Sequence, residues 1–547
     1  MTETNIAARF SAYAATHPAQ TALICTDRKR PARQYSYRQV DETSTAIATG
    51  LRKAGIRKGD HVVLMVLPGL DFFTSVFALF KLGAVLIGID PGMGIRNLGR
   101  CLEEAQPVAF IGNRRAHLAR RLLRWAAASL RFLIATDAIP FQGDIINLVR
   151  IQEWGAADGA TLTSDTQAGD TAAILFTSGS TGLPKGAVYT HSNFSAQVAA
   201  LQQTFDLRPG EIDLATFPLF ALYAPVMGMT SVIPAMDFTR PGNVDPLQIH
   251  HAITTCRPTS MFGSPALLNR VGRWGVANNI TLPGLRRVLT AGAPVAPAVL
   301  ERFSRLLDPG VQIHTPYGAT EALPVSSIGS DAVLNETGRL TAQGRGICIG
   351  NAVAGIEIRI IPITDEPIAQ WRDELALPTN EIGEIAVRGP QVTSSYYNRE
   401  EATRLAKIAV GADGFYHRMG DLGYLDERGR LWFCGRKSQR VNTAQGTLYT
   451  IPCEAVFNTH PRVSRTALVG VPAHGACTPV LCVEPEAGVR KSEHTTIKSE
   501  LLALGGQHAH TAAIRHILFH KRFPVDIRHN AKINRERLAL WAQRRVR

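Results

Sequence analysis

Residues 177–186 read Thr177-Ser178-Gly179-Ser180-Thr181-Gly182-Leu183-Pro184-Lys185-Gly186 and directly follow the apolar run Ala172-Ala173-Ile174-Leu175-Phe176. The apolar run predicts a buried strand, and the polar stretch predicts a loop at its end. Glycines let the backbone approach an anion closely, while hydroxyls, amide N–H groups and one lysine neutralise phosphate oxygens. The stretch therefore predicts a phosphate-binding loop for a nucleotide triphosphate, with contacts from Thr177, Ser178, Gly179, Ser180, Thr181, Gly182 and Lys185.

The loop differs from two other common phosphate-binding patterns. Lys185 is followed by Gly186, so the Ser or Thr that holds Mg²⁺ in the Walker pattern is absent, and the dinucleotide-binding pattern G-x-G-x-x-G is absent from the loop as well. A flexible Gly/Ser linker would lack both the preceding strand and the Pro-Lys-Gly ending. A triphosphate site of a different class is therefore the favoured interpretation.

Length and composition indicate a globular protein of several compact units. The 547 residues exceed what one ordinary hydrophobic core supports, and 45% hydrophobic with 19% charged residues exclude a disordered or fibrous class. The formal net charge of +14 favours anionic partners: nucleotides, CoA-like molecules, nucleic acid or acidic lipid headgroups. A nucleic-acid-binding protein is one alternative, but the sequence has no helix-turn-helix, RNP or zinc-finger pattern.

The cysteines and the N-terminus indicate a cytoplasmic protein. Eight cysteines are scattered without a Cys-x-x-Cys pair or a His cluster at zinc-ligand spacing, which is typical of reduced thiols. Residues 1–5 are polar and lack the basic and apolar regions of a secretory signal. The most apolar stretch, residues 72–89, is interrupted by Lys81-Leu82-Gly83, so we expect a capped helix, then a buried strand, and no membrane span.

Helix and strand patterns alternate from residue 36 to residue 112. Ser36 and Gln39 are placed as a capping box at the start of a helix that Gly55 ends. Strands are expected at 61–67, 85–89 and 108–112, with a helix at 98–104 between the last two. This βαβ rhythm is typical of a mostly parallel sheet, so the predicted fold class is α/β.

Residues 113–132 predict a basic amphipathic helix, with arginines placed among Leu118, Leu122, Leu123 and Trp125. Such a helix binds an anionic membrane surface or an acidic partner, or it is the solvated face of a helix packed on a sheet. The solvated face is the commoner case and is favoured here. Peripheral membrane contact through Asn113–Phe132 is the alternative.

Five further segments, in order along the chain, resemble those of the adenylate-forming superfamily, which includes acyl-CoA synthetases, luciferases and non-ribosomal adenylation domains. They are Thr290–Pro294, Tyr317–Glu321, His417–Gly423, Gly435–Lys437 and Arg528–Arg535. The phosphate loop resembles the signature loop of the same superfamily. This likeness implies a large N-terminal adenylation domain of βαβ-layered sheets, residues 1–436, and a smaller C-terminal α+β lid domain, residues 437–547.

The resemblance assigns contacts to the base and the phosphates of ATP. It implies that the small residues Ala291, Gly292 and Ala293 shape the slot for adenine. Tyr317 and Gly318 lie against the base by the same likeness, and Thr320 contacts a phosphate oxygen. Glu321 is the implied ligand of a Mg²⁺ ion that bridges the phosphates.

The ribose contacts follow from two more segments. By resemblance, Asp421 accepts hydrogen bonds from both ribose hydroxyls, as a carboxylate with two oxygens can do. Arg436 supplies a second contact to ribose or phosphate, and the large domain ends there. ATP and Mg²⁺ are therefore the implied cofactors.

Lys532 matches the superfamily's catalytic lysine. A cation is needed because a carboxylate and the α-phosphate repel each other, and the transition state gathers negative charge on the phosphoryl oxygens. In the alternative, Lys532 belongs to a basic, solvated tail with Arg528, Arg535 and Arg537. By the same resemblance, Thr320 and Glu321 are also catalytic. The implied reaction is attack of a carboxylate on the α-phosphorus of ATP, which gives an acyl-adenylate and pyrophosphate.

Two regions depart from the pattern of acyl-CoA ligases. Ser438 stands where most members carry an acidic or Lys hinge, and residues 441–454 have their glycine and glutamate displaced. Because this hinge and loop help to build the thiol tunnel in CoA ligases, the departure puts a CoA-dependent step in question. Ala221 stands where many acyl-CoA ligases carry His.

The region around Phe217–Tyr223 predicts the acid-binding pocket. Together with Met227, Met229, Phe262 and Leu267, it is expected to form an apolar and roomy wall that suits a long alkyl chain. In the alternative, these are core residues.

Residues 217–223, 444–461 and 528–532 resemble the olefin β-lactone synthetases within the superfamily. That likeness implies ATP-dependent activation of a long-chain 2-alkyl-3-hydroxy acid as acyl-AMP, followed by intramolecular closure to a β-lactone. It also implies a lipid acid as substrate and other enzymes of a hydrocarbon-forming assembly as candidate partners. Two alternatives stay open: a long-chain fatty acyl-CoA ligase, and a catalytically idle scaffold, against which Lys185, Glu321, Asp421 and Lys532 argue.

Overall fold

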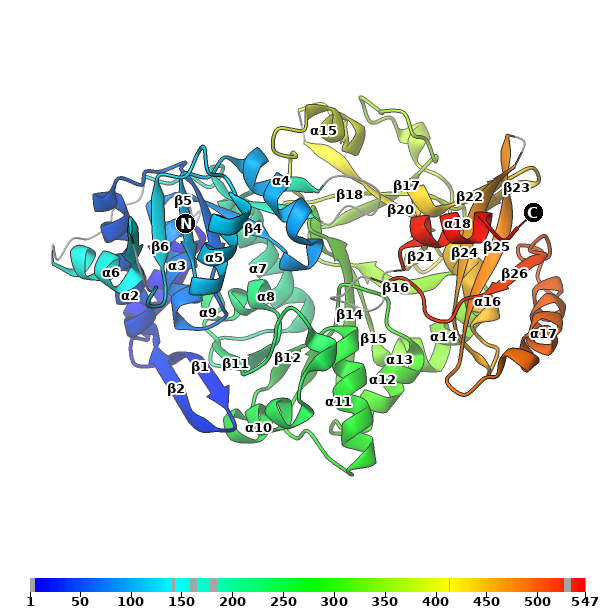
Figure 1. Ribbon diagram of the computed structural model, residues 1–547, viewed down its shortest axis with the longest axis horizontal. Coiled ribbons are helices and arrows are strands. Elements are labelled where there is room, and N and C mark those ends of the chain that lie inside the picture. The colour runs from blue at the N-terminus through cyan, green and yellow to red at the C-terminus, as the bar shows by residue number, and fades with distance from the viewer. Residues whose placement is uncertain are drawn as a thin grey trace.

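The computed structural model describes residues 5–139, 143–157, 165–177, 184–412, 414–473, 475–525 and 533–546. Two large sheets with their helices form most of the molecule, and a smaller group of strands and helices from the C-terminal part of the chain lies at one end (Figure 1). All eight cysteines carry free thiols. Within the described ranges, no helix combines the length and the apolar character needed to cross a bilayer.

The first sheet has seven strands and is mostly parallel. In spatial order these are β7 (Ile145–Asn147), β6 (Phe132–Ala135), β5 (Ala109–Gly112), β3 (His61–Met65), β4 (Val85–Ile89), β8 (Thr171–Thr177) and β9 (Lys185–Thr190). Only β9 runs antiparallel to its neighbour, and it pairs Lys185 with Thr177 of β8. The predicted phosphate loop therefore joins the two strands of a hairpin, and the predicted α/β fold is confirmed.

Two helices of this part of the chain, α2 (Tyr37–Ala54) and α3 (Leu70–Leu82), end where the sequence predicts. Its other described helices are α1 (Ile6–Thr16), α4 (Ile95–Ala105), α5 (Arg114–Leu123), α6 (Leu148–Ala156) and α7 (His191–Phe205). The capping box of Ser36 and Gln39 is present, and Gly55 and Gly83 end their helices in the left-handed conformation, with φ of 108° and 74°.

The predicted helix over 113–132 is wrong in its length. Helix α5 ends at Leu123, because Arg124 and Ala126 adopt left-handed conformations with φ of 53° and 47°. Trp125 is then buried beside α4, and the chain enters β6 at Phe132. The residues after Leu123 are apolar because they pack in the core and form a strand. Their pattern therefore resembled the continuation of a helix.

The second sheet has fourteen strands and crosses the molecule. Along its path the strands are β17 (Glu357–Ile361), β18 (Gly383–Arg388), β20 (Phe415–Leu425), β21 (Leu431–Arg436), β16 (Ile347–Ala352), β15 (Ala322–Gly329), β14 (Gln312–Ala319), β13 (Arg287–Leu289), β12 (Ser260–Phe262), β10 (Ile212–Ala215), β11 (Thr230–Pro234), β1 (Thr21–Asp27) and β2 (Arg30–Ser36), with β19 (Lys407–Ala409) paired to β20. The strands from β1 to β14 are mostly parallel, whereas those from β14 to β17 pair antiparallel.

Helices on this second part are short or begin at a proline. They are α8 (Pro218–Ala221), α9 (Tyr223–Val226), α10 (Pro246–Cys256), α11 (Pro265–Ala277), α12 (Pro297–Ser304), α13 (Ser330–Ala332), α14 (Gly338–Ala342) and α15 (Glu400–Ala406). Proline suits the first helical position because its missing N–H would have no partner there. Side-chain caps from Asp245 and Ser264 fix the starts of α10 and α11.

A segment between β18 and β19 joins the two sheets. The amide of Val188 in β9 donates to the carbonyl of Ser395 at 3.0 Å, and the amide of Tyr397 donates to the carbonyl of Gly186 at 2.8 Å. A few residues earlier, the amide of Thr393 donates to the carbonyl of Glu321 at 2.9 Å. Residues 392–397 therefore hold the hairpin of β8 and β9, here called the phosphate hairpin, next to the turn between β14 and β15.

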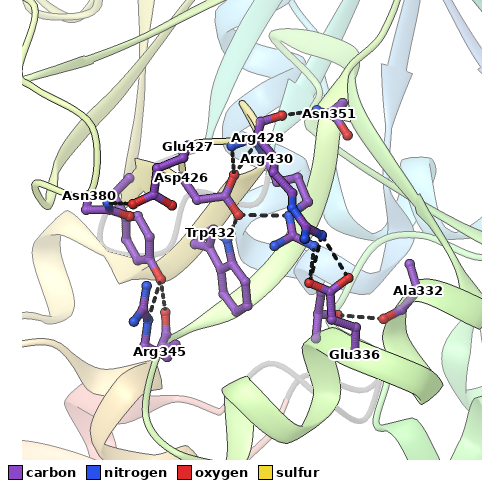
Figure 2. Close-up of polar contacts among 12 residues, drawn as sticks. Ala332, Glu336, Arg345, Asn351, Asn380, Asp426, Glu427, Arg428, Arg430 and Trp432 are labelled. Carbon is purple, nitrogen blue, oxygen red and sulfur yellow. Dashed lines mark hydrogen bonds and ion pairs between the residues drawn. The ribbon is translucent and has the colours of Figure 1, made fainter.

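The hairpin of β20 and β21 is held by a polar cluster at its turn, shown in Figure 2. Asp426 accepts hydrogen bonds from Arg430 Nε at 2.8 Å and from Trp432 Nε1 at 2.9 Å. Arg428 and Arg430 both contact Glu336, at 3.1 and 2.9 Å. Because charge-assisted bonds to a half-buried carboxylate constrain the turn, they also fix the register of the two strands that lead to the cavity.

The C-terminal residues build two small sheets with their own hydrophobic clusters. The strands are β22 (Val441–Thr443), β23 (Gly446–Leu448), β24 (Val463–Ala473), β25 (Ala476–Pro485) and β26 (His516–Phe519), and the helices are α16 (Thr450–Phe457), α17 (His494–Gly506) and α18 (Arg535–Gln543). This part approaches the large sheet closely at Gly435, whose φ is +125° and whose added Cβ would lie 2.4 Å from Thr450 Oγ1. Only glycine fits that position.

A buried ion cluster involves β20, one of the strands that carry the predicted ribose contacts. Arg418 in β20 binds Glu384 in β18 at 2.6 Å, and both side chains are almost fully buried. Lys437 contacts the same carboxylate at 3.2 Å. Loss of Glu384 would therefore leave the buried Arg418 uncompensated, and would leave Lys437 with the exposed carboxylate of Asp365, 3.8 Å away.

We expect Glu384→Gln to destabilise the protein by about 3–5 kcal/mol, because it leaves the buried Arg418 without its ionic partner. The measurement is the midpoint of thermal unfolding followed by circular dichroism. Glu401→Gln is the matched control, since Glu401 binds Arg404 at 2.7 Å in an exposed pair and its loss should leave the midpoint nearly unchanged. Equal midpoints for the two variants would contradict the role given to the buried cluster.

Candidate active site

A cavity of about 2460 Å³ collects most of the predicted site residues from six separate segments. Its lining includes Thr177, Lys185, Ala291, Gly292, Ala293, Tyr317, Gly318, Thr320, Glu321, Asp421 and Arg436. The predicted residues Ser178, Gly179, Ser180, Thr181, Gly182 and Lys532 lie outside the described residues. The predicted side chains in the lining lie up to 259 positions apart in the sequence. They come together because both large sheets contribute to the wall of one cavity.

Asp421 forms the centre of one end of the cavity. It is directly opposite Arg436 in the pairing of β20 and β21, and its Oδ1 lies 3.0 Å from Arg436 Nη1. Tyr317 Oη donates to Asp421 Oδ2 at 2.6 Å. Asp421 raises the pKa of Arg436, and burial followed by the charge of Asp421 raises the pKa of Tyr317 well above its ordinary value. Asp421 is therefore a preorganised acceptor, and both of its neighbours stay protonated.

The small-residue turn after β13 lies beside this acceptor. Ala291 is almost fully buried, and Gly292 has a φ of 95°, which is a left-handed conformation that glycine adopts without strain. A flat group can approach this backbone closely because no large side chain stands in front of it. The turn lines the same cavity as Tyr317 and Asp421, as the sequence predicts for a base slot.

Glu321 forms the second polar centre, at the turn between β14 and β15. Tyr396 Oη donates to Glu321 Oε1 at 2.8 Å, and Lys185 Nζ lies 5.1 Å from the centre of the Tyr396 ring. The hydroxyl of Thr393 donates to the carbonyl of Glu321 at 3.2 Å. Sequence reasoning missed Tyr396 and Thr393, since nothing in their local pattern shows that residues 392–397 pair with both sheets.

The donor set around Glu321 fits one kind of metal ion. In the part of the chain that is described, no cluster of three or more His, Cys, Asp or Glu side chains could hold a metal by itself. Glu321 offers one carboxylate on the same cavity that Lys185 lines. Mg²⁺ commonly binds through one or two carboxylates plus substrate phosphates and water, so these residues fit Mg²⁺ and not a closed protein site.

Two further basic side chains lie behind Glu321. Lys407 Nζ donates to the carbonyl of Thr393, and burial lowers the pKa of Lys407 to about 7, although Glu321 opposes that shift. Burial, reinforced by Lys407, lowers the pKa of His417 well below its ordinary value, so His417 is neutral. Sequence reasoning missed Lys407, because its place on the short strand β19 becomes visible only in the folded sheet.

Aromatic side chains line the opposite end of the cavity. Phe220 stacks on Phe262 with ring centres 4.4 Å apart, and Phe217 lies 5.7 Å from Phe220. The predicted pocket residues Met227, Met229 and Leu267 are corrected by the structure: they are buried in the core and are absent from the cavity lining. Their apolar character alone could not separate the wall of a pocket from the core behind it.

A chain of hydrogen bonds crosses from the aromatic end to the Thr320 turn. Tyr223 Oη donates to Gln197 Oε1, Gln197 Nε2 donates to Tyr189 Oη at 3.3 Å, and Tyr189 Oη donates to the carbonyl of Thr320. All four residues line the cavity. Sequence reasoning missed this chain, whose members come from β9, α7, α9 and the turn after β14.

The residues on either side of the undescribed stretch 526–532 also reach the cavity. Val525 and Ile533 form an isolated antiparallel bridge, and both line the cavity together with Arg535. Arg535 binds buried Glu454 of α16 at 2.7 Å. At the predicted hinge, Ser438 lies between Lys437 and Arg440, and both neighbours contact Asp365, at 3.8 and 2.8 Å.

Comparison with known proteins places this geometry in a family. Residues 10–397 match the family described as AMP-binding enzyme. The chain is 48% identical over 553 residues to the olefin beta-lactone synthetase of Xanthomonas campestris pv. campestris, covering 99% of this chain and 98% of the relative. It is 47% identical over 549 residues to the olefin beta-lactone synthetase of Stenotrophomonas maltophilia, covering 98% of each.

Solved structures show the same fold at lower identity. The amide bond synthetase McbA from Marinactinospora thermotolerans superposes with a TM-score of 0.79 at 20% identity, over 98% of this chain and 99% of McbA. ATP-bound MatB from Rhodopseudomonas palustris superposes with a TM-score of 0.77 at 20% identity, over 98% and 99%. With the family match over most of the chain, the conclusion is that this protein belongs to the AMP-binding enzyme family and is an adenylate-forming, AMP-forming ligase.

Proposed function

We propose that this protein is an ATP-dependent β-lactone synthetase that activates a long-chain 2-alkyl-3-hydroxy acid and closes it to a β-lactone. The observation that carries the proposal is identity of 48% and 47% to two olefin beta-lactone synthetases over nearly the whole chain. The cavity supports it, because one end carries the polar groups for a nucleotide and the other end is aromatic and apolar. A nucleic-acid-binding protein or an idle scaffold accounts for neither feature.

In the proposed activation step, the substrate carboxylate attacks the α-phosphorus of ATP and pyrophosphate leaves. Asp421 accepts the ribose hydroxyls and Arg436 adds a contact to ribose or phosphate, while Ala291, Gly292 and Ala293 face the base. Lys185 and the loop before it bind phosphate oxygens. Glu321 would hold Mg²⁺ together with the phosphates, where the ion would neutralise charge on the leaving pyrophosphate.

Lys532 is proposed to offset the charge that builds up on the α-phosphoryl oxygens. The support is its match to the family segment and the cavity-lining position of Ile533 and Arg535, the described residues that follow it. Residues 437–547 are proposed to form the lid domain that carries Lys532, and residues 1–436 the adenylation domain. The separate hydrophobic clusters of the C-terminal strands support this division.

In the proposed closing step, the 3-hydroxyl oxygen attacks the acyl carbon. The bond from that carbon to the phosphate oxygen breaks, AMP leaves with the electron pair, and the hydroxyl proton passes to the AMP phosphate. No external nucleophile is needed, because an intramolecular hydroxyl held in a productive orientation reaches an effective molarity of about 10⁵ M or more. The alternative is a long-chain acyl-CoA ligase, in which an external thiol takes the place of this hydroxyl.

We expect a 2-alkyl-3-hydroxy acid to yield AMP, pyrophosphate and a β-lactone at a rate that does not depend on CoA. The 3-deoxy analogue should stop at enzyme-bound acyl-adenylate, since it has no internal nucleophile. Mass spectrometry and NMR of the product, with AMP release measured in parallel, check both statements. Stimulation by CoA together with an acyl thioester would identify a CoA ligase instead.

We expect Asp421→Ala to raise the KM for ATP about 10-fold to 100-fold with a smaller change in kcat. Hydrogen bonds to a charged group contribute about 1.5–3 kcal/mol, and ribose contacts are made equally in the ground state and the transition state. Steady-state kinetics of pyrophosphate release measure the two constants separately. Asp373→Ala, at an exposed position away from the cavity, is the control. A collapse of kcat at an unchanged KM would mean that Asp421 acts in the chemistry.

We also propose that the protein binds an anionic membrane surface at the edge where β3, β4 and β5 end. Exposed apolar side chains gather on the segments that follow these adjacent strands: Leu67, Ile95, Leu118 and Leu122, with exposed fractions of 72, 63, 58 and 72%. Residues 93–102 and 113–131 carry eight arginines and no Asp or Glu. Leucines among arginines suit the boundary between acyl chains and anionic headgroups.

The position of this edge supports a lipid source for the substrate. Leu67, Met93 and Arg115 line the cavity at the same edge, so the surface borders the space proposed for the acyl chain. Contact with another enzyme of a hydrocarbon-forming assembly is the competing use of the same surface, and the following experiment separates the two.

We expect the protein to sediment with vesicles that contain phosphatidylglycerol and not with vesicles of phosphatidylcholine alone. The double variant Leu118→Ser/Leu122→Ser should lower the bound fraction severalfold, because it removes apolar area that enters the interface. Leu540→Ser, at a side chain that is 60% exposed on α18, is the matched control. Equal binding by the double variant and the control would contradict membrane docking through α5 and favour a protein partner.

A further inference from the structure

The hydrogen-bonded chain of Tyr223, Gln197 and Tyr189 is not required by the chemistry of adenylation. Gln197 is 1% exposed and lies among aromatic rings: Tyr189 stacks on Phe194 at 4.9 Å, and Phe220 meets Tyr223 edge-on at 6.0 Å. A pocket for a plain alkyl chain would be served by apolar side chains alone. A buried amide in such a wall costs free energy unless each of its polar groups is hydrogen-bonded, so an N–H that the protein leaves without an acceptor calls for one in the substrate.

The direction of the chain fixes how the amide is oriented. Tyr189 donates its one hydroxyl proton to the carbonyl of Thr320, so toward Gln197 it can only accept, and it accepts from Nε2. Tyr223 donates its proton to Oε1 of the same amide. Burial raises the pKa of both tyrosines above the ordinary value, so both keep the protons that these bonds need.

Each group in this chain can form few hydrogen bonds beyond those already made. A primary amide has two N–H donors, and the bond to Tyr189 uses one of them. The second N–H of Gln197 has no acceptor among the described residues, and Gln197 lines the cavity. A substrate oxygen is the acceptor that can satisfy it without displacing either tyrosine.

One end of the hydrogen-bonded chain lies at the turn where the substrate carboxylate is expected to bind. Its last bond goes to the carbonyl of Thr320, next to Glu321, and these residues line the cavity together with Lys185, in the part proposed to hold the phosphates. A hydroxyl on the third carbon is only two carbon atoms away from the carboxyl carbon. A substrate with its carboxylate at this turn therefore brings its 3-hydroxyl toward Tyr189 and Gln197.

We propose that Gln197 donates its second amide N–H to the 3-hydroxyl oxygen of the substrate, and that Tyr189 and Tyr223 are positioning residues that orient the amide. This specificity site rests on the proposed β-lactone synthetase function. The donated bond occupies one lone pair of the hydroxyl oxygen and leaves the other to attack the acyl carbon. The hydroxyl proton stays available for the AMP phosphate, to which it passes as the bond from the acyl carbon to that phosphate breaks.

The site selects the substrate and does not remove its proton. Each member of the chain is neutral, and the chain ends on a backbone carbonyl, which does not take up a proton at neutral pH. A 3-deoxy acid would place a methylene group against the amide and leave its N–H without a partner. A site built to bond a hydroxyl discriminates against the analogue that lacks it far better than an apolar pocket discriminates by shape.

The test compares 3-hydroxy and 3-deoxy acids in adenylation and in closure. For the wild-type enzyme, kcat/KM for pyrophosphate release should favour the 3-hydroxy acid. In Gln197→Met, which keeps side-chain length without an amide, we expect this preference to fall about tenfold, the equivalent of one hydrogen bond. Closure of preformed acyl-adenylate in a single turnover should slow by a similar factor.

Two further variants make the result specific. Gln202→Met is the matched control on the same helix, since Gln202 contacts Arg9 at 2.7 Å and does not line the cavity; it should keep the wild-type preference. Tyr223→Phe removes the bond that orients the amide and leaves Gln197 in place, so it should lower the preference partially. If Gln197→Met does not fold, Tyr223→Phe decides the question by the same ratio.

The outcomes separate this inference from the proposed function. A Gln197→Met or Tyr223→Phe enzyme that keeps the full preference while the wild type makes β-lactone would overturn the site and leave the function intact. A wild-type enzyme that makes thioester would overturn the function. A preference for 3-hydroxy acids that still depends on Gln197 in that case would support the binding site by itself.

Discussion

Residues 392–397 form hydrogen bonds with strands of both large sheets, and the geometry of the cavity depends on this pairing. On one side they bind β9, which begins at Lys185, and on the other they bind the turn that carries Thr320 and Glu321. Backbone bonds of this kind leave little freedom for relative movement of the two sheets. The phosphate hairpin and the Glu321 turn, which are more than 130 residues apart in sequence, thus face the same space at a fixed separation.

Near this segment, each carboxylate has a positively charged group or a hydroxyl group close to it. Asp421 has Arg436 and the Tyr317 hydroxyl, and Glu321 has the Tyr396 hydroxyl with Lys185 beside it. Glu384 binds Arg418 and Lys437, and all three line the same cavity. Such pairs hold the functional carboxylates in place before a substrate arrives, because a buried charge without a partner is costly.

The two ends of the cavity differ in the chemistry they can perform. The part of the cavity proposed for the nucleotide carries acidic and basic side chains and the left-handed Gly292, whereas the part proposed for the acyl chain carries stacked aromatic rings. Gln197 and its two tyrosines are neutral and lie at the junction of these ends. An acid activated at the first end and held by its chain in the second must pass this junction, which is where an internal nucleophile would have to be oriented.

The sequence by itself determined the α/β class, and it predicted the phosphate loop and the motifs around Tyr317, Asp421 and Arg436, because each is a run of a few adjacent residues whose local pattern carries its chemistry. It also determined the ends of helices at Gly55 and Gly83, where only backbone conformation matters. Only the tertiary structure decided that Tyr396, Lys407 and Gln197 join the site, that α5 stops at Leu123, and that Met227, Met229 and Leu267 belong to the core. The physical reason is that these outcomes depend on contacts between segments far apart in the chain and on which side of a wall a side chain points, and neither quantity is recorded in the order of neighbouring residues.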